Sequence, residues 1–484
     1  MKIANIYPAN LSNNVCIDTE LILTFKEKPF LGKSGYIRVF EYETEELVDI
    51  IDLSLPAGPS KARKNPSADY IKSPYEYKDE IITNKNTVAG TPSADYIQSD
   101  EKFQLTIIGG FSDGFHFYPL FIKDNSVHIQ LHHNLLDYNR KYYVLMDPGI
   151  VKGFNGFSKK SDWSFTTRCS PSPLARVLTV SKDGKGDFAT IQGAIDFVPN
   201  HADKLSRYTI FIKNGDYREL VYFRNKDYIT IIGESADGVI IHYANNEIFN
   251  PHPELIKTNE KAGTFPSRRA AFAMDNCTHI VLKDLTVKND AVGQAEGLLV
   301  NGNNNYFKNV RIIGSGDALQ TNGSAFYDNC IIYGHGDTIL GRGPAYFYKT
   351  TIYSTDAFMW IRNTAENHGN VFVECVFNGQ GENSVIARLP NNNGMQYPDA
   401  ECVLIDCQLN GVPPIGFYPI DDDALSANFL EYNSHDKNGK PLDMSLRHKC
   451  VKVLTLEKDK ELIKKYSDYQ YVLGKGFNKQ QLLS

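Results

Sequence analysis

The chain has 484 residues, with 51 Lys and Arg against 57 Asp and Glu, for a formal net charge of −6. This length exceeds that of one ordinary domain and predicts two or three. The mild charge balance and the lack of a dense Lys/Arg run argue against a nucleic-acid partner, and no stretch is apolar for long enough to predict a transmembrane helix. The opening MKIANIYPAN has no apolar segment typical of a signal peptide, so we expect either a cytosolic protein or one whose signal has been removed.

Residues 1–168 contain short apolar runs separated by turn signals, a spacing typical of a β-sandwich: ELILTF, GYIRVF, SVHIQL, KYYVLM and DWSFTT. A polar stretch at 56–102, in which PSADYI occurs twice, interrupts this pattern and is interpreted as a long insertion. The two ends of the block resemble a bacterial Ig-like module, which implies a spacer or adhesion unit without chemistry. Residues 169–177 are interpreted as a linker, which leaves 178–484 as the second domain.

That second domain is expected to begin with a short helix over 191–198 and to continue as repeated strands. Similar six-residue segments start at 282, 307, 327, 348, 372 and 404. Steps in the low twenties are typical of one coil of a parallel β-helix. Cys330, Cys375 and Cys407 share one position of the repeat, which indicates small buried side chains rather than disulfides. The sequence therefore predicts an all-β protein, a right-handed parallel β-helix preceded by a β-sandwich.

Two adjacent coils carry a sharper repeat, Gly314-Ser315-Gly316-Asp317 and Gly334-His335-Gly336-Asp337. Because the aspartates and the coils have the same 20-residue step, we expect the two carboxyl groups one rung apart, about 4.8 Å along the stack. If both ionised, their repulsion would cost on the order of 3 kcal/mol, so their pKa values should split. The spacing alone leaves three interpretations open: a general acid beside a nucleophile, two turn residues bonded to backbone amides, or a shared cation.

Further segments occur in a fixed order: VSKDGKGDFATIQGAIDFVP, YTIFIKNGDYRELV, ITIIGES, GQAEGLLV, GSGDALQ, YGHGDTILG, IARLP and FLEYN. With them, residues 176–435 resemble the pectin methylesterase (pectinesterase) family. The resemblance implies a carbohydrate esterase that hydrolyses the methyl esters of galacturonate in pectin. It also implies that no metal and no organic cofactor takes part.

The same resemblance implies a role for four residues. Asp337 would be the nucleophile, and Asp317 would be the general acid that protonates methanol and then the base that activates water. Gln294 would donate its amide to the oxyanion, and Arg388 would orient Asp337 and keep it ionised. The family ordinarily has Gln before the general acid, whereas this chain has Gly316, so His335 or Gln320 is a candidate substitute donor.

The family also ordinarily has a Trp after its Arg motif, which ARLPNNNG lacks. Trp360 is therefore a candidate aromatic wall for the sugar, Arg362 a candidate second clamp on the substrate, and Tyr397 a candidate lining residue of the groove. The predicted partner is pectin, bound by a monomer that is secreted, periplasmic or on the cell surface.

Three alternatives to an esterase stay open. One is another pectin-active β-helix enzyme, a polygalacturonase or a lyase, although the order Gln294, Asp317, Asp337, Arg388 fits these less well. Another is a non-catalytic pectin-binding protein in which Gly316 marks lost activity. The third is a cytosolic thioesterase on the same scaffold.

Overall fold

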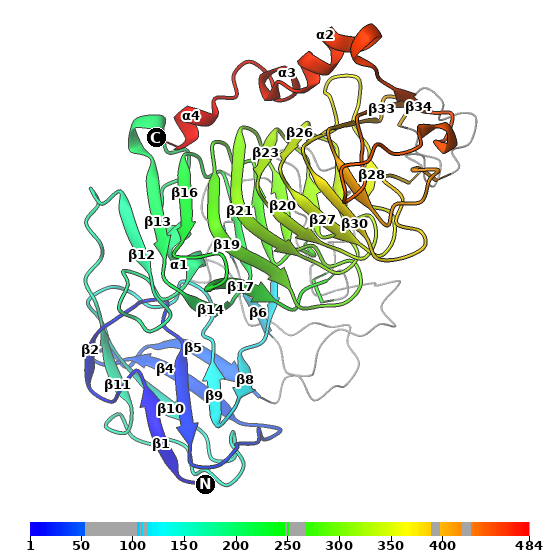
Figure 1. The fold of residues 1–484 in the computed structure, drawn as a ribbon. Coiled ribbons are helices and arrows are strands. Elements are labelled where there is room, and N and C mark those ends of the chain that lie inside the picture. The colour runs from blue at the N-terminus through cyan, green and yellow to red at the C-terminus, as the bar shows by residue number, and fades with distance from the viewer. Residues whose placement is uncertain are drawn as a thin grey trace. The chain divides into compact units, whose positions relative to one another are not determined.

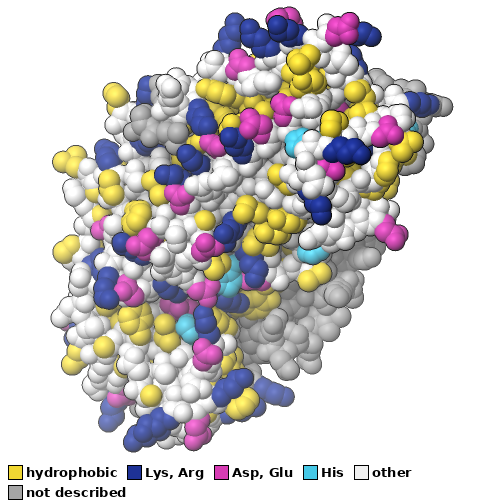
Figure 2. Space-filling view, in the orientation of Figure 1, with side chains coloured by type: hydrophobic (Ala, Val, Ile, Leu, Met, Phe, Trp, Pro, Cys, Tyr) yellow, Lys and Arg dark blue, Asp and Glu magenta, His cyan; other side chains and the backbone are white. Residues whose placement is uncertain are grey.

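The computed structural model describes residues 1–53, 104–106, 108–109, 115–246, 249–250, 268–388, 397–418 and 427–483. The predicted insertion at 56–102 lies outside these residues. The chain forms two compact units, Met1–Phe197 with Ile248–Lys257, and Val198–Glu247 with Thr258–Ser484. Within the described ranges, no helix has the length and apolar character needed to cross a membrane. On the face shown in Figure 2, basic and acidic side chains are interspersed, consistent with the mild net charge.

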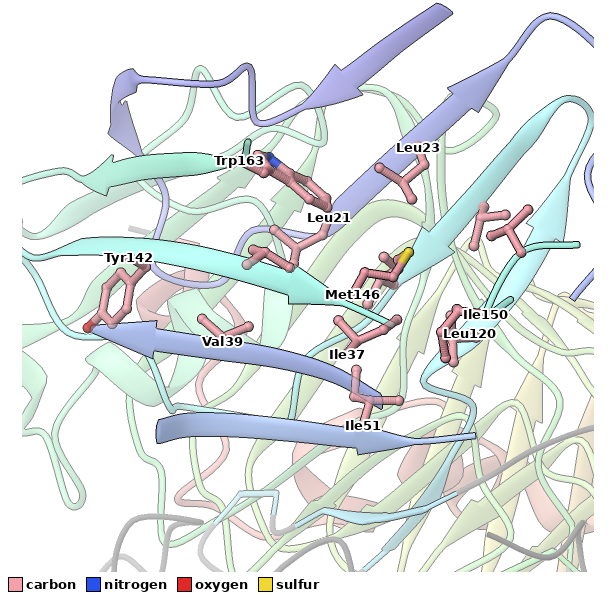
Figure 3. Close-up of a cluster of buried hydrophobic side chains, with 14 of the residues drawn as sticks. Leu21, Leu23, Ile37, Val39, Ile51, Leu120, Tyr142, Met146, Ile150 and Trp163 are labelled. Carbon is pink, nitrogen blue, oxygen red and sulfur yellow. The ribbon is translucent and has the colours of Figure 1, made fainter. Parts of the chain in front are cut away.

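In the first unit, two sheets enclose one hydrophobic core. The four-stranded sheet has the order β1-β3-β9-β8 and the five-stranded sheet the order β2-β11-β10-β4-β5. Every second residue of β3 is buried, as are Ile37 and Val39 of β4, and Figure 3 shows Leu21, Leu23, Ile37 and Val39 in this core with Trp163. This alternation is what a strand with one buried face requires, and it confirms the predicted β-sandwich. The Ig-like resemblance stays a prediction, as do the domain boundaries at 168 and 178.

The elements of the first unit are β1 (Ile3–Tyr7), β2 (Ser12–Val15), β3 (Leu21–Phe25), β4 (Tyr36–Glu41), β5 (Leu47–Asp52), β6 (Gln104–Thr106), β7 (Phe115–Phe117), β8 (Leu120–Lys123), β9 (Ser126–Ile129), β10 (Lys141–Met146), β11 (Ser164–Thr167), β12 (Val177–Val180) and α1 (Ile191–Phe197). Helix α1 covers most of the predicted segment, and its first turn is closed by the Thr190 hydroxyl, which accepts the Gly193 N–H.

The second unit is a parallel β-helix, as predicted. Its strands stack in two sheets, a long one that runs from β13 to β34 and a six-stranded one with the order β15-β18-β20-β22-β25-β28. Figure 1 shows β19, β21, β23 and β26 side by side along the unit. The nine-residue strand β21 pairs with both β23 and β24, so the long sheet bends and gives each coil a third face.

The strands of the second unit are β13 (Tyr208–Ile212), β14 (Gly215–Arg218), β15 (Val221–Arg224), β16 (Ile229–Gly233), β17 (Val239–Tyr243), β18 (Phe272–Asp275), β19 (Val281–Asn289), β20 (Leu298–Asn301), β21 (Asn305–Ile313), β22 (Leu319–Thr321), β23 (Ala325–Asp328), β24 (Ile331–Tyr333), β25 (Ile339–Gly341), β26 (Ala345–Tyr348), β27 (Thr351–Ser354), β28 (Met359–Ile361), β29 (Asn370–Val373), β30 (Val376–Gly379), β31 (Glu401–Ile405), β32 (Gln408–Asn410), β33 (Asn428–Tyr432) and β34 (Val451–Val453). Its helices are α2 (Leu456–Tyr466), α3 (Tyr469–Leu473) and α4 (Lys479–Leu483), with short 3-10 turns at Lys204–Ser206 and Met444–Leu446.

An inner column of aromatic rings shows one error in the predicted repeat. Tyr327 pairs with Phe347, not with Tyr348, and their rings stack with centroids 4.7 Å apart. The fourth segment therefore starts one residue earlier than predicted, because Phe347 and Tyr348 are both aromatic and either fits the pattern. In that coil Thr350 occupies the position that Cys330 has in the coil before it.

The cysteines of the repeat are buried and free, as expected. The thiols of Cys330 and Cys407 each lie near the carbonyl two residues back and a carbonyl of the preceding coil, and Thr350 makes the same two contacts through its hydroxyl. Burial raises the pKa of Cys330 to about 12, so its thiol is inert at neutral pH. These positions need a small side chain that can donate a hydrogen bond inward.

At one corner of the coils, the backbone turns through a residue with positive φ. These residues recur with the coil and have φ between 49° and 54°: Asp284, Asn309, Asn329, Lys349, Glu374, Asp406 and Asn433. Asn and Asp tolerate this region better than most residues. Their side chains also bond from coil to coil, as Asn329 Nδ2 does to Asn309 Oδ1 at 2.6 Å. Successive corner residues are 25, 20, 20, 25, 32 and 27 residues apart, which gives the length of each coil.

Candidate active site

Asp317 and Asp337 occupy the same position in adjacent coils. Each precedes a strand by two residues, Asp317 before Leu319 of β22 and Asp337 before Ile339 of β25, and these two strand residues are register partners. The predicted one-rung relation follows from this pairing. Asp337 has φ of 44°, a strained value that Asp adopts more readily than most side chains.

Arg388 holds Asp337. Its Nε lies 2.7 Å from Oδ1 and 2.8 Å from Oδ2 of Asp337, and both side chains keep about a quarter of their surface exposed (27% and 21%). Burial raises the pKa of Asp337, and the Arg388 guanidinium opposes that rise. A charge-assisted contact to both carboxylate oxygens fixes the orientation of the group as well as its charge.

Asp317 has a different environment. It is 7% exposed, and its Oδ2 accepts a hydrogen bond of 3.1 Å from Arg269 Nη2. The same guanidinium binds both oxygens of Glu296, which is fully buried. Burial and the neighbouring Glu296 raise the pKa of Asp317 to about 7, against the opposing effect of Arg269. Asp317 is therefore suited to hold a proton near neutral pH.

The loop that carries Gln294 is bonded to the loop that carries Asp317. Ala295 and Ser315 exchange two backbone hydrogen bonds of 3.1 Å, and Gln294 Oε1 accepts a hydrogen bond from Arg269 Nη1. Gly316 has φ of 70°, and a Cβ on it would lie 2.6 Å from the carbonyl oxygen of Gly293. A side chain at 316 is thus excluded by conformation and by space, which explains the departure from the family pattern at this residue.

Trp360 of β28 lies between two arginines of the site. The guanidinium carbons of Arg388 and Arg362 lie 4.1 Å and 4.3 Å from its ring centroid, distances typical of cation–π contacts. Tyr397 meets the Trp360 ring edge-on with centroids 6.5 Å apart, and its hydroxyl accepts a hydrogen bond of 3.3 Å from Arg342. Three predicted binding residues, Trp360, Arg362 and Tyr397, are therefore brought together beside Asp337.

The two candidate substitute donors lie in contrasting environments. Gln320 is fully buried on β22, in register with Leu340, which is itself in register with Trp360. Neither amide atom of Gln320 has a hydrogen-bond partner among the described residues. His335 is exposed, and its backbone N–H bonds to the Gly316 carbonyl. A buried, unsatisfied amide is costly, which makes Gln320 the more unusual of the two side chains, whereas the His335 side chain is exposed.

Sequence reasoning missed Arg269, Glu296, Arg342 and Asp356. Asp356 raises the pKa of Asp337 and accepts a hydrogen bond of 2.7 Å from the Tyr418 hydroxyl. One signal was available for Glu296, which precedes Leu298 by two residues, as Asp317 precedes Leu319. Arg269 and Asp356 lie three residues before Phe272 and Met359, so the same signal would find them only with an offset of one residue.

A solved structure supports the fold. Over 63% of this chain and 95% of its own, a pectin methylesterase from carrot superposes with a TM-score of 0.51 at 21% sequence identity. At this identity the likeness concerns the parallel β-helix and not the reaction.

Sequence relatives cover less of the molecule. Pectinesterase QRT1 of Arabidopsis thaliana is 30% identical over 194 residues, which are 38% of this chain and 49% of that protein. Putative pectinesterase 11 of Arabidopsis thaliana is 35% identical over 91 residues, 18% of this chain and 26% of that protein. The chain thus matches about half of the first relative's length and about a quarter of the second's. The Pectinesterase family model, however, matches residues 177–475, which is more than half of the chain. The chain belongs to the pectinesterase family.

Proposed function

We propose that the protein hydrolyses methyl esters of galacturonate in pectin (homogalacturonan) and releases methanol. The observation that carries this proposal is the unequal pair of stacked aspartates. Asp337 has Arg388 as its own cation, whereas Asp317 shares Arg269 with a second carboxylate, Glu296. One group is thereby kept ionised for attack and the other protonated for donation, which is the division of labour that acyl transfer requires.

The reaction would proceed in two steps. In the first, an oxygen of Asp337 attacks the ester carbonyl, and Asp317 gives its proton to the departing methoxide, so that methanol leaves and an acyl anhydride stays on Asp337. In the second, ionised Asp317 takes a proton from water, and the hydroxide attacks the galacturonyl carbonyl of the anhydride, so that the bond to Asp337 breaks, galacturonic acid leaves and Asp337 is again a carboxylate. The products are methanol and a carboxylic acid, and both aspartates return to their starting states.

The oxyanion of each tetrahedral intermediate needs hydrogen-bond donors. The Gln294 amide is the predicted donor, and the Gln320 amide, on the strand that follows the Asp317 turn, is a second candidate. One such donor contributes about 10²–10³ in rate in well-studied esterolytic sites. The cluster of Trp360, Tyr397 and the adjacent arginines supplies an aromatic face and positive charge for a sugar chain that bears carboxylates.

Pectin is a polymer outside the cells that make it, so we also propose that the enzyme acts outside the cytoplasm, secreted, periplasmic or on the cell surface. The β-sandwich unit would carry no chemistry of its own. No metal or organic cofactor enters the proposed steps.

The test is methanol release from highly methylated pectin by the intact protein and by Asp337→Asn. Asparagine suits the positive φ of residue 337. Asp406→Asn is a matched control, since Asp406 also has positive φ, 52°, and lies in the same unit outside the site. Release that survives in Asp406→Asn and disappears in Asp337→Asn supports the esterase. Pectin binding without release supports the binding-protein alternative, and unsaturated or saturated uronic acid products support a lyase or a polygalacturonase.

A further inference from the structure

Four acidic or basic side chains form a column along the six-stranded sheet. Arg269, Glu296, Asp317 and Asp337 lie two or three residues before the first paired residues of β18, β20, β22 and β25, which are consecutive strands of that sheet. Arg388 closes the column beyond Asp337. Three carboxyl groups thus stand between two guanidinium groups.

Arg269 forms hydrogen bonds with three other side chains of the site. Its Nε and Nη2 bind both oxygens of Glu296, its Nη2 also reaches Asp317 Oδ2 at 3.1 Å, and its Nη1 binds Gln294 Oε1. Its side chain is 15% exposed and that of Glu296 is 0% exposed. Buried carboxylates of this kind are retained only when they are paired, so Glu296 and Arg269 hold each other in place.

The contact with Gln294 fixes the direction of its amide. A guanidinium has five donors and no acceptor, so the atom of Gln294 that faces Arg269 is the carbonyl oxygen. The NH₂ group of Gln294 must then face away from Arg269. Without this contact the amide would be free to turn over, and the oxyanion would meet an acceptor as often as a donor.

We propose that Arg269, anchored by the buried Glu296, is a positioning residue of the esterase site that sets the direction of the Gln294 amide and the charge state of Asp317. This inference rests on the proposed function and deepens it. Glu296 acts through Arg269 and through its field at Asp317, and neither residue bonds to the ester.

The arrangement of charges in the column indicates that Asp317 is the carboxyl group that holds a proton. Glu296 has two oxygens bound by Arg269, and Asp337 has two oxygens held by Arg388, which leaves Asp317 in the middle between two carboxylates. The charged groups that act on Asp317 are Glu296 and Asp337, which favour its protonated form, and Arg269 and Arg362, which favour its ionised form. Removing Arg269 should therefore raise the pKa of Asp317, and removing the Glu296 charge should lower it.

The test compares Arg269→Gln, Glu296→Gln and the double variant. The Asp317 carboxyl is titrated in ¹³C-aspartate-labelled protein without substrate, its signal being identified by its absence in Asp317→Asn. We expect a pKa above the wild-type value in Arg269→Gln, below it in Glu296→Gln, and near it in the double variant. A structural role alone would not move one group in opposite directions. Unchanged titration in both single variants, or movement in the same direction, overturns the proposal.

Activity provides the second readout. Arg269→Gln and the double variant should lose about 10- to 100-fold in kcat with little change in KM, because the Gln294 donor is no longer oriented in either. Arg311→Gln, which breaks a surface pair with Asp237 in the same unit, is the control and should keep wild-type kinetics. The double variant carries no unpaired buried charge, so it guards against a single variant that fails to fold. If the wild-type protein releases no methanol, the proposed function fails while the titration still decides the roles of Arg269 and Glu296 at Asp317. Normal kcat in the double variant would refute the positioning of Gln294.

Discussion

Replacing Asp317 by Asn should stabilise the protein in a pH-dependent manner while it removes activity. The pKa of Asp317 rises from 3.8 to about 7 on folding because the group is buried beside Glu296. Well below its unfolded pKa of 3.8 the carboxyl is protonated in both the folded and the unfolded chain, so it favours neither. As the pH rises toward 7 the unfolded chain releases the proton first, and the folded state loses stability until its own carboxyl ionises.

The size of this effect follows from the two pKa values. One pKa unit corresponds to 1.36 kcal/mol, so the ionised, folded Asp317 costs at most about 4 kcal/mol at pH 8. Asparagine is neutral at every pH, and its oxygen still accepts the hydrogen bond from Arg269. We therefore expect Asp317→Asn to differ from the wild type by less than about 1 kcal/mol at pH 4 and to exceed its free energy of unfolding by up to about 4 kcal/mol at pH 8.

Urea unfolding at pH 4 and pH 8, monitored separately for the two units, measures the difference. The matched control is Asp406→Asn, which makes the same chemical change in the same unit outside the site. An Asp317→Asn variant that is no more stable than the wild type at pH 8 would show that the buried carboxyl is not under electrostatic strain. It would also remove the physical basis for Asp317 as the general acid.

Three further predictions concern neighbours of the aspartates. Arg388→Met removes the cation that opposes the burial of Asp337, so its pKa should rise, and the acidic limb of the kcat/KM profile should move to higher pH; an unmoved limb would contradict this assignment. Gln320→Leu removes a buried, unsatisfied amide and should raise the free energy of unfolding by about 1–3 kcal/mol while lowering kcat, and a gain in stability without any loss of kcat would separate Gln320 from the reaction. Gly316→Ala places a Cβ 2.6 Å from the Gly293 carbonyl oxygen at positive φ and should destabilise the protein by more than about 1 kcal/mol in thermal unfolding, and an unchanged melting temperature would be the opposing result.

The sequence predicted the β-helix because its coils repeat in a way that residue types reveal. The same repeat also predicted that Asp317 and Asp337 lie one rung apart. The error at Tyr348 arose because an aromatic residue on either side of the strand satisfies the pattern, and only the strand pairing distinguishes them. The corner residues with positive φ would have given the correct step, since Asn329 and Lys349 are 20 residues apart.

The environment of Asp317 was harder to predict. Arg269 lies 48 residues before Asp317 in sequence, and a contact over that distance follows only once the number of residues in each coil is known. Gly316 looked like a lost donor from the sequence, whereas the structure shows a turn too tight for any side chain. The family resemblance supplied the predicted roles of Gln294 and Arg388, but Arg269, which we propose orients Gln294, lay outside its motifs.

The corner residues with positive φ and the 20-residue step from Asn329 to Lys349 limit which parts of the second unit can change in sequence. The separation between the proposed nucleophile, Asp337, and the proposed general acid, Asp317, is set by the spacing of hydrogen-bonded strands, so it does not depend on the side chains that fill the coil. Thr350 occupies the position that Cys330 has in the preceding coil, which shows that an interior side chain can be exchanged while the strand spacing stays constant. Gln294 and Arg388 instead come from coils with steps of 25 and 32 residues, where extra length is accommodated in loops. Changes in those loops can therefore alter substrate preference, while the separation between Asp317 and Asp337 stays constant.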